Sequence, residues 1–187
     1  MISLFMIESN LFMNYSSKTS SLAQQLAEFL EDSKEQLVFA ESCTAGLAAS
    51  TLASVPGISQ YLCGSAVVYQ IPTKVAWLEI APDLIGTCGY VSEEVAVAMA
   101  RGVLQMTPHA TLSASITGDL GPNAPEETDG TAWIAVLSRD DRLITKQVDL
   151  PSSVPENQIN HGVTLRVHRQ QEAVDLLFQT VIDFMKS

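Results

Sequence analysis

The sequence is poor in basic residues and in cysteine. Lysine and arginine together number 10, aspartate and glutamate 21, and the formal net charge is −11. A protein that binds a nucleic-acid backbone needs clustered Lys and Arg, so we expect no nucleic acid as the main partner. The three cysteines are too few and too irregularly spaced for a disulfide framework or a zinc site, which predicts a reducing, cytoplasmic location. They are Cys43, Cys63 and Cys88.

The sequence also lacks a long hydrophobic run. Nothing approaches the ~20 apolar residues that span a bilayer, so we expect no membrane segment. The first apolar run stops at Glu8 and no Lys or Arg precedes Lys18, which is unlike a signal peptide. Because two further methionines follow the first in this stretch, residues 1–19 are interpreted as a poorly ordered extension or as a start placed too early. Residues 20–187 are predicted to form a single domain.

Several well-known motifs are absent. There is no G-x-x-x-x-G-K-S/T loop, and no G-x-G-x-x-G follows a strand, which excludes a Walker loop and a dinucleotide fingerprint. Ala45 stands three residues after Ser42, so the S-x-x-K pattern of penicillin-recognising enzymes is missing as well. The histidines show no arrangement that suggests a catalytic triad with a serine. They are His109, His161 and His168.

Apolar runs alternate with amphipathic stretches along the chain. The helical and strand periods of these stretches predict that helices alternate with strands. Pro72 suits the first turn of one helix, and Ser92 suits the N-cap of another. This order predicts an α/β fold, a three-layer α/β/α sandwich with a mixed sheet, whose strand order the sequence leaves open. The predicted helices are 21–30, 45–53, one containing Lys74, 92–106 and 165–184, and the predicted strands are 37–40, 64–69, 110–116, 131–137 and 143–148.

Ser42 lies on the predicted turn between a strand and a helix. An α/β fold places ligand-binding groups at such turns. The Ser42 hydroxyl could act as a nucleophile there, with free helix N–H groups to stabilise an oxyanion. The commoner role of Ser42 or Thr44 at this position is to cap the helix. Both interpretations stay open from the residues alone.

Lys74 is the best candidate for a base that would activate Ser42. A lysine accepts a proton near neutral pH only if burial or a nearby cation lowers its pKa, and the apolar residues 75–78 make burial plausible. Tyr69 could relay the proton or donate a hydrogen bond to the substrate. More often, such a lysine is exposed on a helix and such a tyrosine merely closes a strand.

Two further features have a functional and a structural interpretation. Cys43 could be a rival nucleophile, because a thiol near a helix N-terminus ionises more readily, although such a cysteine is more often a small buried hydrophobe. The loop from Gly118 to Gly130 is rich in turn-forming residues. It could cradle a phosphate or ribose with backbone N–H groups, or be only a surface connection.

Taken together, five motifs resemble one known family in their order and approximate spacing. The chain is similar to a stand-alone member of the CinA C-terminal domain family over residues 20–184. The motifs are Glu41-Ser42-Cys43-Thr44-Ala45-Gly46, Val55-Pro56-Gly57-Ile58-Ser59, Val67-Val68-Tyr69 with Lys74, Val91-Ser92-Glu93-Glu94-Val95, and Thr117-Gly118 with Gly121-Pro122 and Gly130-Thr131-Ala132-Trp133.

The resemblance implies an α/β/α domain that hydrolyses the carboxamide of nicotinamide mononucleotide to nicotinate mononucleotide and ammonia, without a metal or other cofactor. It implies a small-molecule nucleotide substrate and a homodimer or larger homo-oligomer. By motif position, Ser42 would be the nucleophile, and Tyr69 and Lys74 would assist proton transfer. The residues that would bind the nucleotide are Cys43, Thr44, Ala45, Gly46, Thr117, Gly118 and Gly121, with Arg169 as a candidate for the phosphate.

The sequence departs from the family pattern at three places. Ala45 replaces a second glycine, Ile71-Pro72 replaces an Asn-Glu pair, and the loop 118–130 is shorter and lacks a glycine pair after its proline. Two hypotheses therefore follow: an active amidohydrolase, or a family member that binds a nucleotide or regulates without catalysis. If the first is correct, we expect Ser42 Oγ within hydrogen-bonding reach of Lys74 or Tyr69, in a pocket that is open at the Ala45 turn. If the second is correct, we expect a solvent-facing Lys74, or a pocket filled by Ile71 or Ala45.

Overall fold

A five-stranded mixed sheet forms the centre of the molecule. The computed structural model describes residues 17–159 and 162–187. The strand order is β2-β1-β3-β4-β5, with β1 parallel to β2 and β3, and β4 antiparallel to β3 and β5. The strands are β1 (Leu37–Glu41), β2 (Leu62–Val67), β3 (Leu112–Gly118), β4 (Thr131–Ser138) and β5 (Leu143–Asp149).

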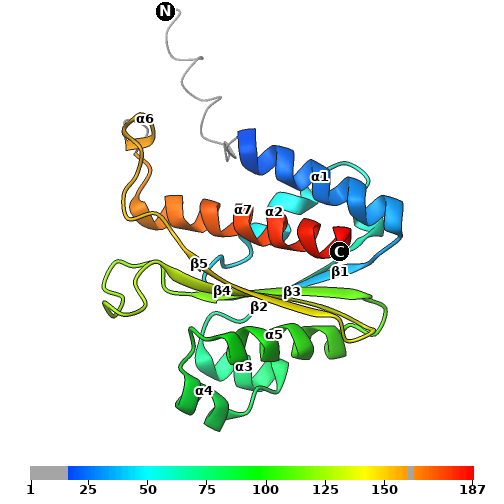
Figure 1. The fold of residues 1–187 in the computed structure, drawn as a ribbon, viewed down its shortest axis with the longest axis horizontal. Helices are drawn as coiled ribbons and strands as arrows, with labels where there is room; N and C mark the ends of the chain where they lie inside the picture. The colour runs from blue at the N-terminus through cyan, green and yellow to red at the C-terminus, as the bar shows by residue number, and fades with distance from the viewer. Residues whose placement is uncertain (1–16, 160–161) are drawn as a thin grey trace, which may run out of the picture.

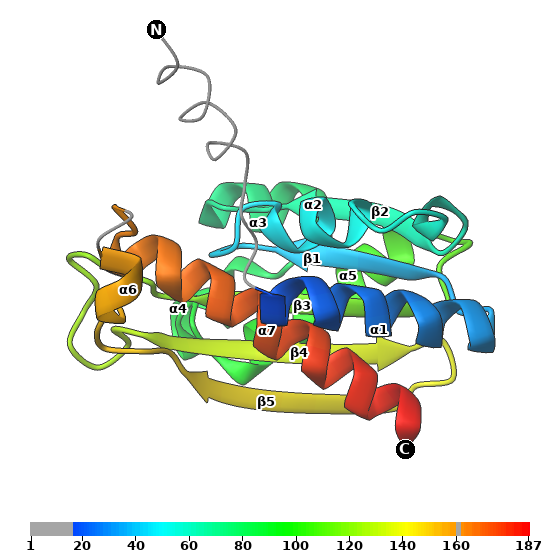
Figure 2. The ribbon, with the colours of Figure 1, turned by 90° about the horizontal axis from the view of Figure 1, so that it is seen from above.

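Helices cover both faces of this sheet, as Figure 1 shows. On one face lie α1 (Ser17–Ser33), α2 (Leu47–Ala53) and α7 (Leu165–Lys186), and on the other α3 (Ile71–Leu78), α4 (Pro82–Cys88) and α5 (Glu93–Met106). In Figure 2, α1 and α7 run beside each other over the sheet. The three-layer α/β/α sandwich with a mixed sheet is thus confirmed.

Strand β1 illustrates why the sheet needs two covering layers. All five of its residues are buried. Side chains alternate across a strand, so Phe39 packs into the core beneath α1, α2 and α7, whereas Val38 and Ala40 pack into the core formed with α5. The continuous apolar run, without alternation of polar residues, is the pattern of a strand buried on both faces.

Some short elements differ from the prediction. Helix α4, the 3-10 helix Ile58–Gln60 and the short α6 (Glu156–Ile159) were not predicted, because each is too brief to develop a hydrophobic period. Helix α1 begins at Ser17, inside the segment 1–19, and residues 1–16 and His161 lie outside the described part. Within the described part, no helix combines the length and the apolar character needed to cross a membrane.

The parallel strands bring distant segments to one edge of the sheet. Glu41, the last residue of β1, pairs with Val67 at the end of β2 and with Ile116 near the end of β3. Ser42 therefore follows β1 at the same edge where Tyr69 follows β2. In open α/β sheets this carboxyl edge is where ligands bind.

Candidate active site

The turn after β1 is organised by the buried side chain of Glu41. Neither Ser42 nor Thr44 caps α2, so that interpretation is wrong; the N-cap is Gly46, which has no side-chain cap. Instead the Glu41 carboxyl group takes up the N–H groups at the start of α2, which are therefore not free to stabilise an oxyanion. It accepts hydrogen bonds from the amides of Gly46, Ala48 and Ala49, each at 3.0 Å, and from the hydroxyls of Thr44 at 2.7 Å and Ser65 at 3.0 Å.

Ser42 and Lys74 are in direct contact. The Lys74 side chain on α3 is only 1% exposed, and its Nζ donates hydrogen bonds to Ser42 Oγ at 2.7 Å and to the Val68 carbonyl oxygen at 2.8 Å. Burial lowers the pKa of Lys74 to about 8, against an effect of Cys43 in the opposite direction. A lysine with such a pKa is partly neutral near physiological pH and can take a proton from the hydroxyl that it contacts.

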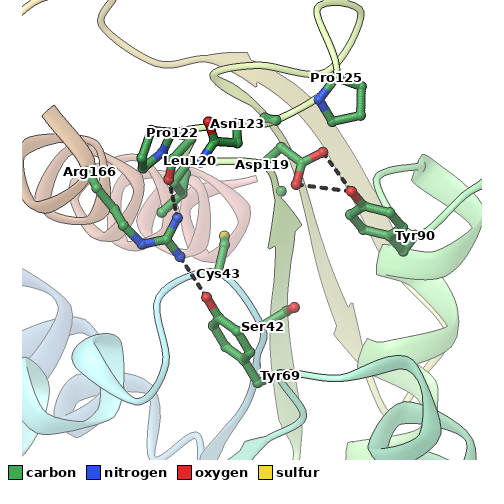
Figure 3. Close-up of a pocket in the computed structure, with 13 residues that line it drawn as sticks. Ser42, Cys43, Tyr69, Tyr90, Asp119, Leu120, Pro122, Asn123, Pro125 and Arg166 are labelled. Carbon is green, nitrogen blue, oxygen red and sulfur yellow. Dashed lines mark hydrogen bonds between the residues drawn. The ribbon is translucent and has the colours of Figure 1, made fainter.

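Tyr69 points away from this pair and contacts an arginine that sequence analysis did not single out. Its hydroxyl accepts a hydrogen bond from Arg166 Nη2 at 2.6 Å, and Arg166 Nη1 donates to the carbonyl oxygen of Gly121 (Figure 3). Tyr69 is 52% exposed, and no bond joins it to Ser42 or Lys74 within the described residues. Arg166 and Tyr69 lie 97 positions apart, so no local pattern could have linked them.

Arg169 supports the loop between β3 and β4. It is 3% exposed, forms two hydrogen bonds with the Asp129 carboxylate at 2.7 and 3.0 Å, and donates to the Pro151 carbonyl oxygen at 2.8 Å. The guanidinium holds the pKa of the Asp129 carboxyl below its usual range. A Cβ at Gly130 would lie 3.1 Å from Arg169 Nη2, so a glycine permits this close packing.

Ser42 lines a cavity of about 210 Å³ at the carboxyl edge of the sheet. An adjoining cavity of about 800 Å³ shares part of the β3–β4 loop and Arg166 with it. The first cavity is lined by Ser42, Cys43, Tyr69, Tyr90, residues 118–125 and Arg166.

The predicted site residues thus fall into two groups. Ser42, Cys43, Tyr69, Gly118 and Gly121 line the cavity. Thr44, Ala45, Gly46, Lys74, Thr117 and Arg169 do not, although Lys74 contacts Ser42 and Arg169 lines the adjoining cavity. Thr117 is buried and donates a hydrogen bond to the Tyr90 carbonyl oxygen at 2.7 Å.

Cys43 is less suited than Ser42 to nucleophilic attack. Burial raises the pKa of its thiol to about 12, so the thiolate is scarce at neutral pH. The thiolate, not the thiol, is the reactive form of cysteine. Among residues 17–159 and 162–187, no group of three or more His, Cys, Asp or Glu side chains is placed to hold a metal ion.

The carboxyl edge of this α/β/α sandwich thus holds a serine hydroxyl in contact with a buried lysine. These are the two groups that a protein with a serine nucleophile and a lysine base would need. The model of the CinA C-terminal domain family matches residues 19–167. The chain therefore belongs to the CinA C-terminal domain family, as the sequence motifs predicted.

Relatives with closely similar sequences occur in mycobacteria. A CinA-like protein of Mycobacterium tuberculosis is 41% identical over 141 residues, which cover 74% of this chain and 32% of the relative. A CinA-like protein of Mycobacterium marinum is 40% identical over 162 residues, 86% of this chain and 37% of the relative. The chain spans about a third of the length of these relatives.

Solved structures share the fold at lower identity. A competence/damage-inducible protein from Agrobacterium tumefaciens superposes with a TM-score of 0.82 at 21% identity, covering 94% of this chain and 99% of that one. A CinA superfamily protein from Escherichia coli gives a TM-score of 0.78 at 22% identity, with coverage of 95% and 98%. These solved structures therefore share the α/β/α fold over nearly the whole length of this chain.

Proposed function

We propose that this protein hydrolyses the carboxamide of nicotinamide mononucleotide to nicotinate mononucleotide and ammonia. The observation that carries the proposal is the 2.7 Å contact between Lys74 Nζ and Ser42 Oγ beside a cavity. The Lys74 side chain is buried, rather than facing solvent. Neither Ala45 nor Ile71 lines the cavity, so the two departures from the family pattern leave it open.

The first half of the reaction is acyl transfer to the serine. Neutral Lys74 takes the proton of Ser42 Oγ while that oxygen bonds to the carboxamide carbon. The carbonyl oxygen becomes an oxyanion. When the tetrahedral intermediate collapses, the C–N bond breaks, and the Lys74 ammonium supplies the proton that the departing amine needs to leave as ammonia.

The second half of the reaction restores the enzyme. Water attacks the ester that joins Ser42 to the nicotinoyl group, and Lys74 takes one proton from this water. The C–O bond to Ser42 breaks, the serine recovers its proton from Lys74, and nicotinate mononucleotide leaves. The carboxylic acid product then loses its proton to solvent, which completes the proton balance of the reaction.

One other group can stabilise a charged part of the substrate. Arg166 lines both cavities and carries a positive charge that suits a phosphate. Arg169, by contrast, is already engaged with Asp129.

The test is ammonia release from nicotinamide mononucleotide by the purified chain, with the acid product identified by chromatography. Ser42→Ala and Lys74→Met should each lower kcat by about 10³-fold or more. Ser59→Ala and Lys146→Met, at exposed positions, are matched controls that should keep wild-type turnover.

Two outcomes would contradict the proposal. Full turnover by Ser42→Ala would exclude the serine as the nucleophile. No turnover by the wild type, together with tight binding of the nucleotide, would instead favour a nucleotide-binding or regulatory role. Circular dichroism of each variant establishes that a loss of activity is not a loss of fold.

A further inference from the structure

A tyrosine–aspartate pair forms one wall of the catalytic cavity and has no part in the mechanism above. Asp119 directly follows β3, and Tyr90 precedes α5. The Tyr90 hydroxyl donates to both carboxylate oxygens of Asp119, at 2.9 and 3.2 Å, and Thr128 Oγ1 donates to Oδ2 at 2.6 Å. Both Asp119 and Tyr90 line the cavity that contains Ser42.

This pair is held in place by its surroundings. The Asp119 amide donates to the Thr131 carbonyl oxygen at 3.0 Å, and its own carbonyl oxygen accepts from Gly130 N at 2.8 Å. Burial, and then the hydrogen bond to Asp119, raise the pKa of the Tyr90 phenol, which therefore stays a donor. The carboxylate is thus oriented before any ligand arrives.

Asp119 and Arg166 place opposite charges on opposite sides of the cavity. Tyr90 leads into α5 on one face of the sheet, whereas Arg166 belongs to α7 on the other face. Figure 3 accordingly draws the Asp119–Tyr90 pair and Arg166 on different sides, with Ser42 between and below them. The cavity therefore has an acidic wall and a basic wall.

We infer that Asp119, oriented by Tyr90 and Thr128, binds the positively charged pyridinium ring of the substrate while Arg166 binds its phosphate. This inference rests on the proposed function and deepens it. A pyridinium nucleotide carries a cationic ring at one end and an anionic phosphate at the other, which matches the two walls. The carboxylate also repels the phosphate, which favours the orientation with the ring at Asp119 and the phosphate at Arg166.

The carboxylate can meet a cation without losing its present partners. Two carboxylate oxygens offer about four acceptor positions, and the Tyr90 and Thr128 hydroxyls occupy three of them. A cationic ring does not need a free acceptor position on the carboxylate, because its attraction to the carboxylate is electrostatic. A nucleotide with an uncharged ring would lack this attraction but keep every other contact.

The experiment compares two ligands that differ in ring charge. Nicotinamide mononucleotide has a pyridinium ring, and its 1,4-dihydro form has an uncharged ring with the same carboxamide and phosphate. Binding of each is measured by calorimetry in a Ser42→Ala background, so that no ligand is consumed. Asp119→Asn is the main variant and Tyr90→Phe the second. Glu127→Gln removes a negative charge from the same loop at an exposed position that lines neither cavity, and it is the matched control.

The Ser42→Ala protein should bind the pyridinium form about tenfold more tightly than the dihydro form. Asp119→Asn should abolish this preference by weakening the pyridinium form alone, and Tyr90→Phe should reduce it. Glu127→Gln should leave it unchanged. Equal affinity of the Ser42→Ala protein for both ligands, equal weakening of both by Asp119→Asn, or no binding of either would each overturn the inference.

The proposed function and the inference about Asp119 are tested by different measurements, so either can fail without the other. Ammonia release by the protein with Ser42 intact is the readout for hydrolysis, and calorimetry is the readout for ring recognition. A ring-charge preference that depends on Asp119, found together with no ammonia release, would support this inference and contradict the amidohydrolase. Ammonia release with no ring-charge preference would support the amidohydrolase and contradict the inference about Asp119.

Discussion

Burial of Lys74 has a consequence for stability that can be measured without any substrate. Folding lowers the pKa of this lysine from 10.5 to about 8. Between these two values the unfolded chain binds more protons than the folded one, so the contribution of Lys74 to the free energy of unfolding rises with pH. Below pH 8 both states are protonated, and the full penalty for burying the ammonium applies.

The magnitude follows from the two pKa values. From pH 7 to pH 9.5, Lys74 should add about 2 kcal/mol to the free energy of unfolding, out of a total of about 3 kcal/mol that is complete above pH 10.5. Other groups titrate in this range as well, so the relevant quantity is the difference between the wild type and Lys74→Met. The methionine fills a similar volume and carries no charge.

Urea denaturation of both proteins at pH 7 and pH 9.5 provides the assay. The wild type should gain about 2 kcal/mol relative to Lys74→Met between the two pH values. Lys146→Met, at an exposed position on β5, should show no such pH-dependent difference. A difference between the wild type and Lys74→Met that does not change with pH would refute the reasoning, because Lys74 would then titrate as an ordinary lysine.

Four further predictions follow from the same contacts. In the proposed mechanism neutral Lys74 is the base, so kcat/KM for amide hydrolysis should rise about tenfold from pH 7 to pH 9, and a flat profile would contradict this role. Glu41→Gln should lower the free energy of unfolding in urea by about 2–4 kcal/mol. The glutamine side chain replaces one acceptor oxygen with an NH₂ group, which would face backbone N–H groups that now donate to the Glu41 carboxyl group. Gly102→Ala should destabilise by about 1–3 kcal/mol in the same assay, although alanine favours helices, because its Cβ would lie 2.5 Å from the Leu78 carbonyl oxygen; an increase in stability would contradict the close packing of α3 and α5. Arg166→Gln should raise KM for the nucleotide about tenfold or more but leave KM for the phosphate-free nucleoside unchanged in steady-state kinetics, and an equal rise for both would exclude a phosphate contact.

The elements that sequence patterns predicted best are those with a strong local signal. Ser92 was expected to cap a helix, and its hydroxyl accepts a hydrogen bond from Val95 N at 3.3 Å at the start of α5. The apolar run of β1 likewise left little doubt about a buried strand. Helix α4 was missed because Ile85 is the only residue of its seven that is buried, so no period develops.

The site was predicted less completely than the fold. Ser42 and Lys74 were paired correctly as neighbours, because a strand-to-helix turn and a lysine after the next strand converge at one edge of a parallel sheet. Capping of α2 by Ser42 or Thr44 was the commoner of two interpretations that the residues left open, but it is Glu41 that accepts hydrogen bonds from N–H groups at the start of this helix. A buried glutamate that bonds residues after it in the chain leaves no signature in hydrophobic periodicity.

The two arginines of the C-terminal helix show where sequence reasoning ends. Arg166 and Arg169 lie three positions apart in α7, with no local feature that separates a ligand-binding arginine from a structural one. Their surroundings differ only in the folded chain. Arg169 meets Asp129 beneath the β3–β4 loop, and Arg166 reaches Tyr69 at the cavity.

The sequence by itself determined the α/β/α architecture, the family and the strand–turn–helix that presents Ser42, because these depend on periodicity and on short motifs. Only the tertiary structure decided the lowered pKa of Lys74 and the opposed charges of Asp119 and Arg166. The physical reason is that desolvation and the electrostatic field in a cavity depend on which distant segments pack together, and no local pattern encodes those distances.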